Sequence, residues 1–110
     1  GRARVARATA SASEADELAE LLAQQVSLEV RRAYLELRGA RQRLAQATKG
    51  VELAERSLEI VADRYREGLT LLTELLDAET SLTRSRLRRI AAERDMLLAR
   101  ATLDLATGDL

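Results

Sequence analysis

The chain has 110 residues, enough for one domain, and its 18 acidic groups balance its 18 basic groups. A neutral chain has no net field that would select a nucleic acid or an anionic membrane as partner, so we expect no nucleic-acid binding. It also lacks cysteine and histidine, which removes disulfides, cysteine–histidine zinc sites and the usual general bases and nucleophiles. We therefore expect no enzyme, no catalytic residue, no cofactor and no metal.

A heptad pattern predicts a long first helix over about residues 4–66. The chain contains no proline, and its apolar residues recur at alternating spacings of four and three. We call this series the first seam: Val26, Val30, Ala33, Leu37, Ala40, Leu44, Ala47, Val51, Ala54, Leu58, Val61 and Tyr65. Its small residues predict close packing against a second helix. Gly39 and Gly50 lie inside this helix, and we interpret them as points of close approach rather than breaks.

A turn over residues 67–70 is predicted to end the first helix. Gly68 is the best candidate for a left-handed residue at the helix end. Thr70 is predicted to cap the next helix through its hydroxyl oxygen. Tyr65 stands beside this turn and is predicted to pack there and orient it.

A returning helix is predicted over about residues 71–107. It has its own heptad series, which we call the second seam: Leu75, Ala78, Leu82, Ser85, Arg89, Ala92, Met96, Ala99, Leu103 and Ala106. Arg89 is the one misfit, explained by a polar layer or by a side chain that extends to water. Two matching seams predict an all-α chain in which residues 1–110 form a single long antiparallel hairpin of coiled-coil type.

Two surfaces are left without a partner in this fold. The first helix is the longer, so about its first 25 residues face no helix of this chain. The returning helix also carries a second apolar stripe, formed by Leu76, Thr83, Leu87, Ile90, Leu97 and Ala101. One hairpin cannot bury these surfaces, so partners are implied and the isolated chain is expected to form a homo-oligomer.

Three stretches of this sequence together resemble one known family. They are VRRAYLELRGARQRLAQA (30–47), LEIVADRYREGLTLLTELLDAETSLTRSRL (58–87) and LLARATLDLATG (97–108). In this order and at these separations they resemble the outer membrane efflux protein family, the TolC-like exit ducts of efflux pumps and type I secretion systems. The match departs from the family at Leu71, where many members have a serine.

The resemblance implies an architecture and a set of partners. Members are homotrimers with a β-barrel in the outer membrane and an α-barrel in the periplasm. This chain would then be a piece of a longer protein, the periplasmic helical hairpin of the second repeat. The resemblance makes Gly68, Leu69 and Thr70 the tip that docks the periplasmic adaptor of an inner-membrane pump. It makes Glu74 and Asp77 the acidic residues at the duct entrance.

Simpler interpretations of the charged residues stay open. Glu74 and Asp77 are also ordinary acids in the first turns of a helix, where the positive end of the helix dipole stabilises them. They lack the third group that a catalytic or metal site needs. The run Arg84, Arg86, Arg88 and Arg89 spreads around the helix and has no aromatic residue nearby for base stacking, so we interpret it as a solvated, salt-bridged face.

Two alternatives for the whole chain also remain open at this stage. One is the α-hairpin of a periplasmic membrane-fusion adaptor from the same pumps, which would have a similar heptad pattern and tip. The other is a generic structural coiled coil without a transport role. The unequal arms count against the first, and the ordered match over residues 65–78 counts against the second.

Overall fold

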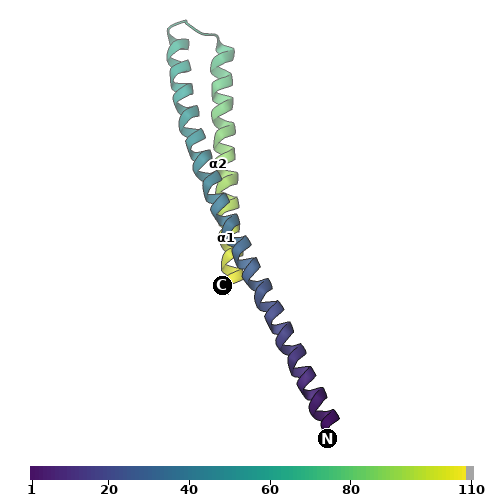
Figure 1. Cartoon of the computed structure of the whole chain (residues 1–110). Helices are drawn as coiled ribbons and strands as arrows, with labels where there is room; N and C mark the ends of the chain where they lie inside the picture. The colour runs from purple at the N-terminus through teal and green to yellow at the C-terminus, as the bar shows by residue number, and fades with distance from the viewer. Residues whose placement is uncertain (109–110) are drawn as a thin grey trace.

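Two helices make up the fold of the computed structural model, which describes residues 1–108. Helix α1 spans Arg2–Arg66 and helix α2 spans Leu72–Thr107. They run antiparallel, side by side, and are joined by a short turn at one end of the molecule (Figure 1). Among the described residues, 94% are helical and none is in a strand. The expected all-α antiparallel hairpin is confirmed.

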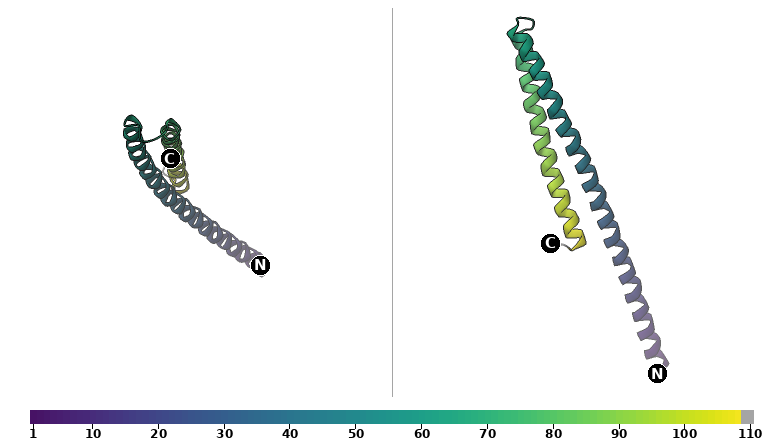
Figure 2. Two further views of the ribbon diagram at one scale, coloured as in Figure 1. Left: turned by 90° about the horizontal axis from the view of Figure 1, so that it is seen from above. Right: turned by 90° about the vertical axis from the view of Figure 1, so that its left-hand side faces the viewer.

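The molecule is a rod of 100 × 21 × 13 Å. A 65-residue helix rises about 98 Å at 1.5 Å per residue, so α1 sets the full length. α2 ends part-way along α1, and the N-terminal part of α1 continues alone (Figures 1 and 2). α1 curves gently and stays helical through Gly50.

The two seams form the interface between the helices. Leu37 and Ala40 of α1 cluster with Ala99 of α2, and Met96 and Leu103 pack against this cluster. The fully buried residues all belong to one seam or the other: Ala33, Leu37, Ala40, Val51, Leu82, Ala92 and Ala99. Small residues at every second seam position let the helices approach closely, as the heptad pattern predicted.

The two internal glycines do not lie at close contacts between the helices, contrary to the prediction. A Cβ added at Gly50 would have no neighbour within 4 Å, and one added at Gly39 would meet only the side chain of Arg43, on the same helix, at 3.2 Å. The interpretation of both glycines as points of close approach is therefore wrong. The buried alanines of the seams, rather than the glycines, set the close packing.

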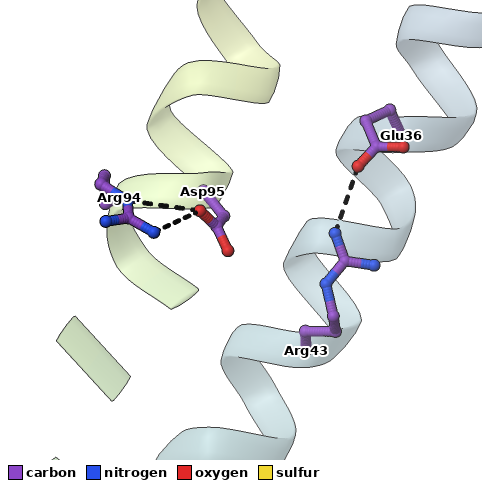
Figure 3. A network of polar contacts seen from close by, with 4 residues as sticks. All are labelled: Glu36, Arg43, Arg94 and Asp95. Atoms are coloured by element: carbon purple, nitrogen blue, oxygen red, sulfur yellow. Dashed lines mark hydrogen bonds and ion pairs between the residues drawn. The ribbon is translucent and has the colours of Figure 1, made fainter. Parts of the chain in front are cut away.

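Polar contacts contribute little to the pairing of the helices. The ion pair between Glu36 and Arg43 lies within α1, and that between Arg94 and Asp95 lies within α2 (Figure 3). Arg86 reaches Glu55 across the interface at 4.0 Å, with both side chains more than half exposed. Such exposed pairs are each worth about 0–1 kcal/mol, so apolar burial determines the pairing.

Candidate functional site

The turn between the helices is held by backbone hydrogen bonds. Gly68 has a φ of 75°, and its N–H donates to the carbonyl oxygen of Tyr65 at 3.0 Å. The N–H of Leu69 donates to the carbonyl oxygen of Arg64 at 2.8 Å. These two bonds form a Schellman motif, which satisfies carbonyls at the end of α1. Gly68 is thus the left-handed residue that the sequence predicted.

The start of α2 differs from the prediction. Leu71, in an extended conformation (φ −86°, ψ 154°), occupies the N-cap position, and no side chain caps the helix. The Thr70 hydroxyl oxygen is buried and has no hydrogen-bond partner. The prediction that Thr70 caps α2 is wrong because the helix begins one residue later, which leaves Thr70 outside the capping position.

Apolar side chains on and beside the turn are largely exposed to solvent. Leu69 is 62% exposed, Leu71 is 68% exposed and Leu72 is 51% exposed. We call these three leucines the tip leucines. Tyr65, in the last turn of α1, is 39% exposed. The turn is therefore a hydrogen-bonded backbone with leucines exposed on it at one end of a long rod.

The two predicted entrance acids lie just behind the tip. Glu74 lies in the first turn of α2 and Asp77 one turn further, and both are exposed. Their spacing of three residues places them on one side of the helix. Within residues 1–108, no ion pair engages either residue and no cluster of acidic residues suited to a metal ion occurs.

The basic run is partly neutralised within the hairpin. Arg89 is 36% exposed and lies 3.8 Å from Glu93, one turn further along α2, while Arg86 faces Glu55. Arg89 thus reaches the edge of the seam and forms a salt bridge there, which supports the interpretation of a solvated face.

Both long sides of the hairpin carry apolar residues that nothing covers. The α2 stripe, as we call Leu76, Leu87, Ile90 and Leu97, is 50–63% exposed. On α1, Leu35, Leu53 and Ile60 are 54–60% exposed, and we call them the α1 outer stripe. Leu35 stands two residues from a seam residue on either side and is therefore nearly opposite α2, whereas Leu53 and Ile60 each stand one residue from a seam residue and lie to one side of the seam. The rod has apolar surface on both sides, besides the interface between its helices.

Comparison with known proteins shows the family to which the chain belongs. The family model described as outer membrane efflux protein matches residues 1–109. The chain belongs to the outer membrane efflux protein family. Protein CyaE of Bordetella pertussis is 38% identical over 94 residues, which cover 83% of this chain and 20% of CyaE. The chain thus spans about one fifth of the length of that relative. No solved structure matches it.

Family membership decides between the alternatives left open by the sequence. The match to outer membrane efflux proteins covers both helices, so neither a membrane-fusion adaptor hairpin nor a generic coiled coil describes the chain. Both helices therefore lie within a match to the outer membrane efflux protein family. Within residues 1–108, neither helix has an apolar segment that meets the length and hydropathy needed to cross a bilayer.

Proposed function

We propose that this hairpin is a wall element of the periplasmic duct of an outer membrane efflux or type I secretion channel, and that its turn docks an adaptor protein. The proposal rests on the distribution of exposed apolar residues in this family member: the rod has apolar surface on both long sides and a leucine-rich tip at one end. We propose no chemical reaction for the hairpin, which acts sterically as part of the duct wall.

The wall role rests on the α2 stripe and the α1 outer stripe. Successive members of the α2 stripe are 11, 3 and 7 residues apart, and Leu53 and Ile60 on α1 are 7 apart, so each set returns to one side of its helix, as a neighbouring helix requires. Exposed apolar rows of this length are uncommon on soluble monomers and mark interaction surfaces. In a closed barrel each hairpin has a neighbour on either side, which covers both rows. We propose a homotrimer of the full-length parent as the assembly that closes it.

The docking role rests on the tip. The Schellman motif fixes the direction of the turn, so the tip leucines are presented on a backbone that needs little ordering when a partner binds. Leu69 and Leu71, each more than 60% exposed, are apolar anchors of the kind that a helical partner buries. The partner we propose is the periplasmic adaptor of an inner-membrane pump, with the docking residues Gly68, Leu69 and Thr70.

The acidic residues Glu74 and Asp77 lie at the proposed entrance to the duct. Glu74 and Asp77 are exposed and lie one turn apart, close to the tip. Repeated around a closed barrel, they would form a ring of negative charge at the mouth of the lumen. Such a ring favours cations and disfavours anions at the entrance.

The proposal is tested in the full-length parent by changing Gly68. Proline at this position cannot adopt a φ of 75° and has no N–H to donate to Tyr65. We expect Gly68→Pro to abolish export while leaving outer-membrane insertion and trimer formation unchanged, because the turn lies far from those contacts. Gly50→Ala, in the helix interior, is the matched control and should export normally. Normal export by a Gly68→Pro protein present at wild-type levels would overturn the docking role.

A further inference from the structure

The arginine run of α2 divides into two pairs with different surroundings. Arg86 and Arg89 each have a glutamate as ion-pair partner within 4.0 Å. Arg84 and Arg88 are exposed, and within residues 1–108 neither of them forms an ion pair. The interpretation of the run as a salt-bridged face therefore describes Arg86 and Arg89 only.

The neighbouring acidic groups of the hairpin are engaged elsewhere. The stretch of α1 beside the arginine run has two of them, Glu52 and Glu55. Glu55 is the partner of Arg86, and the Glu52 carboxylate lies 3.4 Å from the ammonium group of Lys49. Residues 80–92 of α2 contain no acidic residue. The two unpaired arginines therefore carry positive charge that the hairpin does not neutralise.

Arg84 and Arg88 share one side of α2 with the proposed entrance acids. Steps of three, four, three and four residues connect one row, which we call the charged row: Glu74, Asp77, Ser81, Arg84 and Arg88. All five residues are exposed. Arg84 lies about 10 Å beyond Asp77 along the helix, and Arg88 about 6 Å further, at 1.5 Å per residue. The charged row thus changes from acidic to basic within about two helical turns of the acids.

We propose that Arg84 and Arg88 form a basic ring inside the duct, directly behind the acidic entrance, which binds anionic groups of the exported molecule. The inference rests on the proposed function. If Glu74 and Asp77 line the mouth of the lumen, the remainder of the charged row lines the lumen behind them. In the proposed homotrimer each copy contributes both arginines to the same zone of the duct.

The chemistry of arginine suits carboxylate and phosphate groups. A guanidinium is planar and always charged, and it donates paired N–H bonds to two oxygens of one anion. Like charges gathered around a narrow lumen with walls of low dielectric constant concentrate the opposite ion, and rings of arginine or lysine select anions in pores. A purely cationic molecule that passes the acidic mouth would be repelled behind it. The exported molecules that we infer therefore carry carboxylate or phosphate groups.

Ion selectivity of the full-length parent in planar lipid bilayers tests the basic ring. The ratio of K⁺ to Cl⁻ permeability, measured from the reversal potential in a KCl gradient, should rise about tenfold in Arg84→Gln/Arg88→Gln. Arg84→Lys/Arg88→Lys retains the charge and should keep the wild-type ratio. Arg86→Gln is the matched control from the same run, and its ratio should also be unchanged because that guanidinium is paired within the hairpin. Unchanged selectivity in the double glutamine variant would overturn the basic ring.

Neutralising the acids separates this inference from the proposed function. Glu74→Gln/Asp77→Asn should lower the same permeability ratio, because the acids then no longer favour cations at the mouth. A lowered ratio in this variant, without a rise in the double glutamine variant of the arginines, would reject the basic ring alone. No change in the acidic variant would reject the proposed entrance, and with it the lumenal placement of the charged row.

Block of the K⁺ current by polyvalent anions identifies the group that the ring binds. Citrate supplies carboxylates and inorganic pyrophosphate supplies phosphates, each added on the side of the bilayer that the tip faces. At least one should block the wild type, with a half-blocking concentration about tenfold higher in Arg84→Gln/Arg88→Gln. Absence of block by both anions, or equal block of wild type and variant, would contradict anion binding by the ring. Native gels of each variant check that the trimer forms.

Discussion

The chain reverses direction at Gly68. Its φ of 75° lies in a region where residues with a Cβ are strained. Nothing stands within 4 Å of a Cβ added there, so the strain is conformational rather than a clash. We expect Gly68→Ala to lower the free energy of unfolding of the isolated chain by about 1 kcal/mol. Gly50→Ala, helical and unobstructed, should raise it by about 1 kcal/mol. Urea unfolding at one fixed protein concentration measures both, and equal effects of the two substitutions would contradict this account of the turn.

Substitutions of Thr70 and Leu71 test how the start of α2 is capped. The Thr70 hydroxyl is buried without a partner, so Thr70→Val should leave stability unchanged or raise it by up to about 1 kcal/mol. Leu71→Ser places a capping oxygen at the N-cap itself and should stabilise by about 1 kcal/mol. Thermal unfolding followed by circular dichroism reports both changes. A loss of about 1 kcal/mol in Thr70→Val would mean that Thr70 caps the helix after all.

At the scale of the helices, the heptad periodicity of the sequence correctly predicted which residues are buried. The features that depend on distances between atoms were not predicted. The heptads identified the buried residues, because only one face of each helix can meet the other. Gly68 was predictable because a left-handed turn favours glycine. The first residue of α2 was not, because the helix begins at Leu72 with no side-chain cap, so no capping residue in the sequence marks its start. Gly39 and Gly50 were misinterpreted because sequence carries no information on the space around a missing Cβ.

The close approach of the helices depends on the small seam residues. Ala40 is 1% exposed and belongs to the buried cluster with Leu37 and Ala99. We expect Ala40→Leu to destabilise the hairpin by about 1–3 kcal/mol, because the larger side chain forces the helices apart. Ala45→Leu is the control at an exposed position of the same helix and should change stability by less than about 0.5 kcal/mol. Chemical denaturation measures the difference, and equal tolerance of leucine at both positions would refute the seam assignment.

For the whole molecule, the features combine into a rod with exposed apolar side chains at separate places. The tip leucines occupy one end, the two stripes run along the sides, and Leu18, Leu21, Leu22 and Leu28 lie on the part of α1 that extends beyond α2. Among residues 1–108, the buried side chains all belong to the seams, and the large apolar side chains outside them are exposed. This distribution supports the proposed role of the hairpin as part of an assembly.

Site-specific photo-crosslinking in the full-length parent tests whether the tip docks the adaptor. A photoreactive residue is placed at Leu69, and separately at Leu53, in cells that also produce the adaptor and the inner-membrane pump. Both positions are more than half exposed, but Leu69 lies on the tip and Leu53 on the side of the rod. We expect Leu69 to capture the adaptor and Leu53 to capture only other parts of the channel. Capture of the adaptor from Leu53 and not from Leu69 would contradict the docking role.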